Sequence, residues 1–307
     1  VYTFPALAVA WLWQKREQAG PDAAWARGGI PLLLAALLLL NLAVTITYGF
    51  VQWPQALETR LKYQSVLVDI ADYLKEEPAG APVFADGFYR PITADSLRRD
   101  LGEDPQGRWV QTGEDVAGAL ILPAGGEGTL FVPEFAAPDE VLLALAGVDM
   151  QPLYRSHKRP AFSVYDLPVE HQESKLPEAL PFEDVLSLVG YEITMTQAGQ
   201  ALQMVTAWQV DGELPDDLAI FVHWSDSTGQ LLSQHDGFDA AAGTLRPGDI
   251  IIQRHILPWP STLQSPTGSL QLGLYLREDG RRLELLDGAG KPATQHLIPL
   301  DEDHLGG

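Results

Sequence analysis

A long uncharged apolar segment near the start of the chain constrains the fold more than any other feature. No charged residue occurs at positions 28–57, and within positions 30–50 Asn41 is the only strongly polar side chain. A helix rises about 1.5 Å per residue, so about 20 such residues cross a hydrocarbon layer of about 30 Å. We therefore predict a transmembrane helix at residues 30–50. Tyr48 and Trp53 lie where an interfacial aromatic belt is expected.

The residues before this segment predict a second, incomplete helix. Residues 1–13 are apolar but too few to span a bilayer, so we interpret them as the end of a truncated transmembrane helix. The connection, residues 14–29, contains Lys15, Arg16 and Arg27. Short loops rich in Lys and Arg stay in the cytoplasm, so we expect this loop inside and the C-terminal domains outside. The lipid bilayer is then the partner of both helices.

Charge and cysteine content exclude several classes of protein. Twenty Lys and Arg against 41 Asp and Glu give a net charge of −21. A nucleic-acid-binding protein needs a basic surface to displace counterions from phosphates, so no nucleic acid is expected as a partner. The chain has no cysteine, which excludes disulfides, a thiolate nucleophile and cysteine-ligated metals.

After the membrane segment, residues 58–168 alternate between helical and strand patterns. An amphipathic helix ending before Pro78 is followed by short apolar runs that suit buried strands. Strands that alternate with helices are typical of a parallel α/β layer, so we predict a small Rossmann-like α/β domain closed by a hairpin. The expected helices are 60–77, 94–101 and 138–146, the strands are 81–86, 109–111 and 128–133, and the hairpin strands are 153–156 and 161–165.

The remaining residues predict an all-β domain. Residues 169–181 are polar with two prolines and read as a linker, and the acidic end, residues 301–307, is expected to be disordered. Between them, residues 182–300 show period-two alternation and frequent turn signals, which favours a β-sandwich of jelly-roll or immunoglobulin-like type. The expected strands are 185–194, 202–210, 218–225, 231–235, 249–257, 269–277 and 282–286.

Common catalytic motifs are missing from the sequence. It contains no G-x-S-x-G, H-E-x-x-H, P-loop or G-x-G-x-x-G pattern. The glycine-rich stretch 124–128 precedes a predicted strand and does not open a helix, so it indicates a turn and no phosphate site. We therefore assign no catalytic, cofactor-binding or metal-binding residue, and the cofactor is unknown.

A polar cluster in the β domain is the first candidate site. Histidines and carboxylates on neighbouring strands could bind a divalent ion or sugar hydroxyls, and Trp208, Trp224 or Trp259 could supply a stacking face. The alternative is that these polar side chains pair across a hairpin or form turns. The candidate glycan-contact residues are His223, Asp226, Gln234, His235, Asp236, His255 and Trp224.

The second candidate site follows the first strand of the α/β domain. Asp86, Tyr89, Arg90 and Asp95 come after the carboxyl end of that strand. Ligands of open α/β sheets usually bind at this edge. The alternative is an ordinary polar loop with an Asp–Arg ion pair.

Five stretches of this chain together carry a family resemblance. The sequence RPAFSVYDLP follows the α/β segment, and in the β domain FEDVLSLVGYEI, LAIFVHWSDSTGQLLSQHDG, LRPGDIIIQRHILPWP and GSLQLGLYLREDGRRLEL follow in order. With the preceding membrane helix they resemble the C-terminal region of bacterial, Chloroflexi-type GT-C membrane glycosyltransferases. That family is related to protein O-mannosyltransferases and lipid A aminoarabinose transferases. His223 and Asp236 match retained polar positions of the pattern, whereas Leu245 replaces its usual tryptophan.

The resemblance implies a function for a longer protein. GT-C enzymes transfer a sugar from a polyprenyl-phosphate donor to a glycan or protein acceptor on the outer face of the membrane. Their catalytic carboxylates lie after the first span, and no residue of this chain matches them, so the chain alone is expected to be inactive. Its outer domains would position the acceptor or support the membrane part. The alternatives are a non-enzymatic membrane-anchored glycan-binding module, which needs an exposed aromatic face, and a purely structural ectodomain.

Overall fold

A computed structural model describes most of the chain. The described residues are 3–18, 24–87, 91–112, 118–136, 140–168, 176, 178–196, 201–260, 267–287, 289–293 and 297–300. They form two compact units, Val1–Tyr63 and Gln64–Gly307. Much of the predicted linker and the whole predicted tail, residues 301–307, lie outside the described residues.

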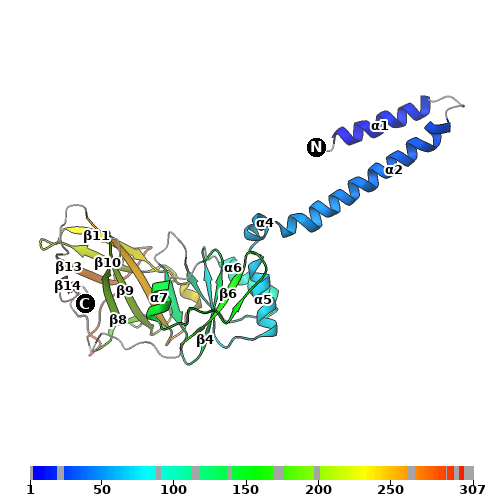
Figure 1. The fold of residues 1–307 in the computed structure, drawn as a ribbon. Coiled ribbons are helices and arrows are strands. Elements are labelled where there is room, and N and C mark those ends of the chain that lie inside the picture. Colours follow the sequence, from blue (N-terminus) through cyan, green and yellow to red (C-terminus); the bar gives the residue numbers. More distant parts are fainter. Residues whose placement is uncertain are drawn as a thin grey trace. The chain divides into compact units, whose positions relative to one another are not determined.

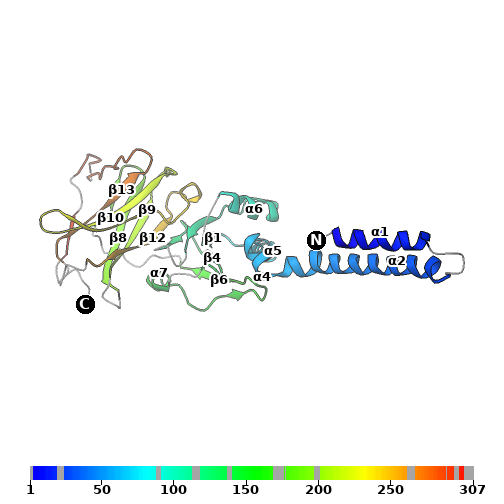
Figure 2. The ribbon, with the colours of Figure 1, turned by 90° about the horizontal axis from the view of Figure 1, so that it is seen from above.

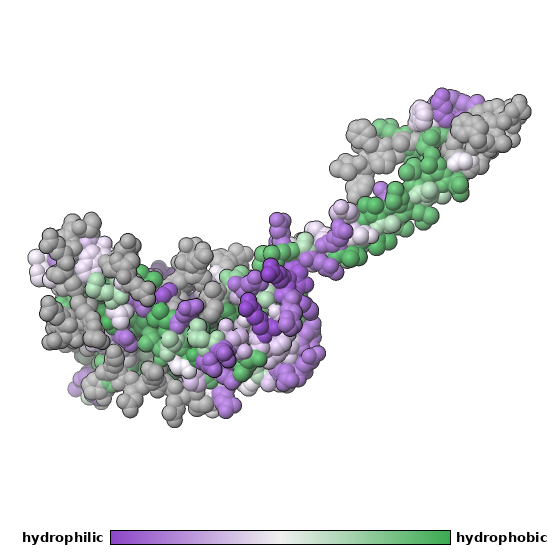
Figure 3. All heavy atoms as spheres, in the orientation of Figure 1, coloured by the Kyte–Doolittle hydropathy of each residue, from purple (hydrophilic) through white to green (hydrophobic). Residues whose placement is uncertain are grey.

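The first unit is a pair of helices that run side by side in opposite directions (Figures 1 and 2). They are α1 (Thr3–Gln18) and α2 (Ala24–Ile46), and α2 continues through a π-helical turn (Thr47–Gln52) into α3 (Trp53–Gln55), which α4 (Leu57–Lys62) follows. The segment Pro31–Gln55 is long and apolar enough to cross a membrane. Most of its side chains are exposed to solvent, with Leu38 and Leu39 each 66% exposed. Figure 3 shows the hydrophobic surface along this segment. The helix predicted at 30–50 is therefore present.

A charge placed on this helix tests whether it crosses a membrane. Arginine at the centre of a transmembrane helix costs about 3 kcal/mol of insertion free energy, whereas leucine is favourable. We expect Leu38→Arg to move most of the protein out of the carbonate-resistant membrane fraction. Leu38→Ile is the control, because it keeps the side chain apolar. Equal carbonate resistance of Leu38→Arg and the unchanged protein would contradict a membrane-spanning role.

The second unit begins with a mixed sheet and its helices. Three parallel strands and an antiparallel pair form the sheet in the order β2-β1-β4-β6-β5. Helices precede and follow β1, whereas strand β3 of another sheet comes between β2 and β4 in the sequence. The expected hairpin is this antiparallel pair. The elements are α5 (Val66–Glu76), β1 (Pro82–Asp86), α6 (Pro91–Leu101), β2 (Arg108–Gln111), β4 (Gly128–Pro133), α7 (Glu140–Leu145), β5 (Tyr154–Arg155) and β6 (Phe162–Leu167).

The three parallel strands of this mixed sheet are buried on both faces, which explains their nearly continuous apolar sequences. Phe84 and Phe131 point toward α5 and stack with ring centroids 5.3 Å apart. Val83 and Leu130 belong to the opposite face and join the hydrophobic core that extends into the β domain. The amphipathic helix predicted at 60–77 is divided, because Gln64 has a positive φ of 48° and α5 begins only at Val66.

The rest of the second unit is built from antiparallel strands in two sheets. The strand orders are β3-β12-β9-β8-β7 and β11-β10-β13-β14, and buried side chains of both sheets share one core. The strand predicted at 282–286 forms only isolated bridges, to Tyr275, Phe182 and Pro292. The strands are β7 (Leu180–Phe182), β8 (Leu186–Met195), β9 (Ala201–Val210), β10 (Leu218–Ser225), β11 (Leu231–Gly237), β12 (Ile250–Pro258), β13 (Ser269–Leu276) and β14 (Leu297–Pro299).

One strand of the antiparallel sheet β3-β12-β9-β8-β7 comes from the α/β part of the sequence. Strand β3 (Ala119–Leu122) pairs with β12 through Ile250–Gln253, in antiparallel register. All four of its residues are buried, so neither face of the strand shows the alternation that marks a half-exposed strand. The two parts of the second unit are thus joined by a shared sheet as well as by a continuous core.

Candidate functional site

The polar residues predicted to form one cluster in the β domain lie on two different faces. Strand alternation places His223 of β10 on the outer face of the four-stranded sheet, together with Gln234 and Asp236 of β11. His235 and His255 point the other way, into the space between the sheets. The structure therefore brings these five residues together as an outer group of three and an inner pair.

The outer group is centred on a contact between the imidazole of His223 and the carboxylate of Asp236. The imidazole Nε2 lies 3.1 Å from the carboxylate Oδ1, and the two side chains are 19% and 27% exposed. Phe221 packs beside His223 at 4.8 Å between ring centroids, and the Arg282 guanidinium covers the Phe221 ring at 4.5 Å. This face presents donors and acceptors to solvent, but its aromatic ring is covered.

The inner pair belongs to a buried chain of hydrogen bonds. Nδ1 of His235 lies 3.0 Å from Nδ1 of His255, and Nε2 of His255 lies 3.0 Å from the hydroxyl of Thr206. That hydroxyl also accepts a hydrogen bond of 2.8 Å from the indole N–H of Trp208. His255, Thr206 and Trp208 are fully buried. Only one proton can lie between the two Nδ1 atoms, so the tautomer of one histidine determines that of the other.

Burial holds both histidines in the neutral form. Desolvation lowers the pKa of His255 well below its usual value of 6.5, and the neighbouring His235 lowers it further. Desolvation also lowers the pKa of His235, although Asp239 and Asp236 act in the opposite direction. For Asp239, burial raises the pKa of the carboxyl group, while a hydrogen bond from the Gly118 N–H opposes that shift.

The lowered histidine pKa values predict a loss of stability in mild acid. Below pH 6.5 the unfolded chain binds a proton at His255 that the folded chain does not bind. The free energy of unfolding therefore decreases as the pH is lowered. For this one buried residue the slope is at most about 1.4 kcal/mol per pH unit. We expect His255→Gln to flatten the slope measured by urea unfolding between pH 7 and 5. His157→Gln, at an exposed histidine, is the control, and an unchanged slope in His255→Gln contradicts the assignment.

The remaining two members of the predicted cluster join neither group. Asp226 forms a turn, in which its carboxylate accepts hydrogen bonds from the Thr228 hydroxyl and from the N–H groups of Thr228 and Gln230. These bonds, led by the Thr228 hydroxyl, lower the pKa of Asp226. Trp224 is fully buried and donates its indole N–H to the Thr267 carbonyl at 3.0 Å.

The three candidate tryptophans of the β domain do not supply an exposed stacking face. Trp208 and Trp224 are fully buried, and half-buried Trp259 packs edge-on against Trp224 at 5.2 Å. A sugar stacks on an aromatic ring only where the ring face is open to solvent. This burial weighs against a module that binds glycan through these three rings.

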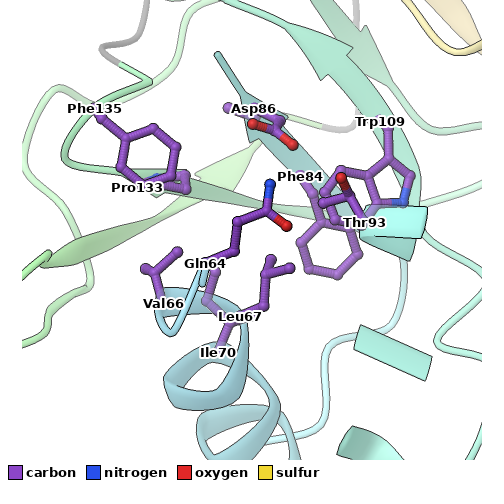
Figure 4. A pocket seen from close by; sticks show the side chains of 11 residues that line it. Gln64, Val66, Leu67, Ile70, Phe84, Asp86, Thr93, Trp109, Pro133 and Phe135 are labelled. Carbon is purple, nitrogen blue, oxygen red and sulfur yellow. The ribbon is translucent and has the colours of Figure 1, made fainter. Parts of the chain in front are cut away.

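The second candidate site is a narrow pocket at the carboxyl end of β1 (Figure 4). Asp86 is 5% exposed and its side chain points into this pocket, opposite Gln64, with Thr93 and Trp109 beside them. The space inside is about 10 Å³, which is room for about one water molecule. It is therefore too small for a nucleotide or a sugar.

The other predicted members of this second site are not gathered there. Tyr89 and Arg90 lie outside the described residues. Asp95 is exposed on α6, where its carboxylate pairs with Arg98 at 3.2 Å. Asp86 is thus the one predicted residue that the structure places in the pocket.

Several buried polar residues were missed by the sequence analysis. Thr206 and Gln253 occupy inward positions of β9 and β12, opposite each other in the register. The Gln253 amide accepts a hydrogen bond from the Asp239 N–H and donates one to the Gly237 carbonyl. Period-two alternation with Trp208 and Ile251 was the available signal, because it places these polar side chains on the core face.

Metal ligands do not converge in the described part of the chain. No group of three His, Asp or Glu side chains there is arranged to hold a metal ion. The facing Nδ1 atoms of His235 and His255 lie 3.0 Å apart, a distance that suits a hydrogen bond between them.

Comparisons with known proteins assign no family. No family model matches the chain, and no curated protein matches it. A solved structure, described as the C-terminal domain of wzt, is 13% identical to the part it matches. The match covers 43% of this chain and 83% of that chain, with a TM-score of 0.28. A similarity at this level assigns neither a fold nor a function.

Proposed function

We propose that this chain is the C-terminal part of an integral-membrane glycosyltransferase. In this proposal the longer protein transfers a sugar from a polyprenyl-phosphate donor on the outer face of the membrane. The second unit, a Rossmann-like α/β layer with a β-sandwich, positions the acceptor or supports the membrane part. Catalytic carboxylates are expected upstream of Val1, so transfer by residues 1–307 alone is not expected.

The solvent-exposed apolar surface of the helix pair is the observation that most supports this proposal. Besides the leucines of α2, the α1 side chains Leu7 and Trp11 are 67% and 59% exposed. An apolar surface of this extent needs lipid or further helices to cover it. Of these described helices, the segment Pro31–Gln55 is the one long and apolar enough to cross a membrane.

The orientation follows from the charges of the connecting loop. The last turn of α1 contains Lys15 and Arg16, and Arg27 follows at the start of α2. Basic residues in a short loop favour the cytoplasmic side. The second unit then lies on the extracytoplasmic side, where a lipid-linked sugar donor would be used.

The construction of the second unit favours a supporting or positioning role. A continuous hydrophobic core joins the mixed sheet to both antiparallel sheets, and β3 extends this connection by hydrogen bonds. A unit with one core resists internal hinge motion better than two domains joined by a linker. Such a rigid body suits the presentation of an acceptor at a fixed place.

The test is a transfer assay on the longer protein. The reading frame upstream of Val1 should encode further apolar spans and an acidic pair after the first of them. Membranes containing that protein should transfer radiolabelled sugar from a polyprenyl-phosphate donor, and deletion of residues 64–307 should reduce transfer. A start codon within a few residues of Val1, or no transfer by the intact protein, overturns the proposal.

A membrane-anchored glycan-binding ectodomain is the second candidate, and the outer polar group favours it. His223, Gln234 and Asp236 offer an imidazole, an amide and a carboxylate on one sheet face. If this face binds glycan, His223→Ala should abolish binding of the intact chain to a glycan array. His157→Ala, at an exposed histidine elsewhere, should not change it. Binding that is insensitive to His223→Ala excludes this face.

A further inference from the structure

A groove in the second unit lies next to the pocket at Asp86, with which it shares Trp109 as a lining residue. It has a volume of about 330 Å³ and is formed by α6, by the loop from α6 to β2, and by the turn that contains Ala242–Thr244. We name it the Arg246 groove. Its lining side chains include Arg98, Asp104, Gln106, Trp109, Thr244 and Arg246.

The charge of the Arg246 groove differs from that of the chain. Two arginines and one aspartate line it, although the protein as a whole has a net charge of −21. Arg98 is already neutralised, because its guanidinium pairs with Asp104 and with Asp95, each at 3.2 Å. Arg246 instead donates from Nη2 to the Gln106 side-chain oxygen at 2.9 Å. Within the described part of the chain, the Arg246 guanidinium has no carboxylate partner.

The groups around Arg246 are held in place before any ligand binds. The Arg246 backbone N–H donates to the buried Asp249 carboxylate at 2.9 Å. Gln106 adopts a left-handed backbone conformation with φ of 52°, and its N–H donates to Asp104 at 2.9 Å. The Thr244 hydroxyl accepts the Trp109 N–H and donates to the Ala241 carbonyl. Groups fixed in this way lose little entropy on binding.

We infer that the Arg246 groove binds a sugar that bears one oxyanion, either a carboxylate or a phosphate. The volume is at the lower end of the range for small-molecule sites, about 300–1,000 Å³. A guanidinium without a carboxylate partner suits bidentate binding of an oxyanion. The Gln106 amide, the Asp104 carboxylate and the ion-paired Arg98 supply the donors and acceptors that sugar hydroxyls need.

This inference rests on the proposed function, because it names the acceptor sugar that the second unit would position. Binding to the groove is measured directly, however, and requires no transfer. Failure of sugar binding would therefore remove the groove from the mechanism without affecting the transfer assay. A failed transfer assay would likewise leave the binding result unchanged.

The experiment is a ligand-observed NMR titration of the intact chain in nanodiscs with three probes. D-glucuronic acid supplies a carboxylate, glucose 1-phosphate supplies a phosphate, and D-glucose is the neutral sugar. We expect one of the two acidic sugars to bind at least tenfold more tightly than D-glucose. Which of them binds more tightly distinguishes a carboxylate ligand from a phosphate ligand.

Three variants locate the binding to this groove. Arg246→Gln removes the charge and should weaken binding of the preferred acidic sugar at least tenfold. Gln106→Gly removes the amide and relieves the left-handed conformation, so it should weaken binding several-fold without lowering the melting temperature. Arg99→Gln is the matched control on α6, because Arg99 is exposed and does not line the groove, and it should bind as the unchanged protein does.

Two results would overturn the inference. One is equal affinity for D-glucose and both acidic sugars, or no binding of any of them. The other is acidic-sugar binding that survives both Arg246→Gln and Gln106→Gly in chains whose melting temperature is unchanged.

Discussion

Replacing Asp249 by asparagine should lower the free energy of unfolding of the second unit by about 3–5 kcal/mol. Asp249 is fully buried and accepts two hydrogen bonds from the Arg108 guanidinium, at 2.8 and 3.0 Å. It also accepts the backbone N–H groups of Ala124 and Arg246. Asparagine removes the charge and one acceptor, so the Arg108 cation, whose side chain is 6% exposed, is left buried without a counterion.

The position of Asp249 explains why one residue has so large an effect. Arg108 begins β2 of the mixed sheet. Ala124 follows β3 and Asp249 precedes β12, and these two strands are neighbours in the antiparallel sheet. One carboxylate thus joins its own segment to two segments that lie more than a hundred residues earlier in the sequence. Its loss weakens the junction between the two parts of the second unit as well as one ion pair.

Urea unfolding of the intact chain in detergent micelles, followed by tryptophan fluorescence, measures this effect. The control is Asp72→Asn, which removes an ion pair whose side chains are 48% and 58% exposed, and its effect should stay below about 1 kcal/mol. The double variant Arg108→Met with Asp249→Asn should be more stable than the sum of the single effects predicts, by at least about 1 kcal/mol. Strictly additive effects contradict a direct interaction between the two side chains.

The segment order could be predicted from the sequence because each segment has a local pattern. Absence of charge marks the helix that includes Leu38, and alternation marks long strands such as β9 and β10 within one or two residues. The strand β3 is only four residues long and entirely apolar, so it shows no alternation. Its partner, β12, lies more than a hundred residues later, and local signals contain no information about that pairing.

The candidate sites could be predicted only in part, for a related reason. The sequence places His223 and His235 among neighbouring polar residues, but the strand register decides which of them faces outward. The Arg246 groove and the Arg108–Asp249 pair depend on contacts between residues more than a hundred positions apart. Residue spacing in the sequence does not predict contacts over such distances unless the fold is already known.

The buried hydrogen-bond chain of the β domain leads to the second large prediction. Replacing Thr206 by valine keeps the shape of the side chain but removes the hydroxyl that serves both Trp208 and His255. Two polar groups in a fully buried place then lose their partner, and each such group costs about 1–3 kcal/mol. We expect Thr206→Val to lower the free energy of unfolding by about 2–5 kcal/mol in the same urea experiment.

Two further variants separate the hydroxyl from the packing. Thr206→Ser keeps the hydroxyl and loses one methyl group, so it should cost only about 1 kcal/mol. In a His255→Leu background, Thr206→Val should cost less than it does alone, because one of the two orphaned groups is already gone. If Thr206→Ser and Thr206→Val are equally destabilising, the methyl packing stabilises this position and the hydroxyl does not. If they differ as expected, the hydroxyl stabilises this position through its hydrogen bonds with the Trp208 indole and the His255 imidazole.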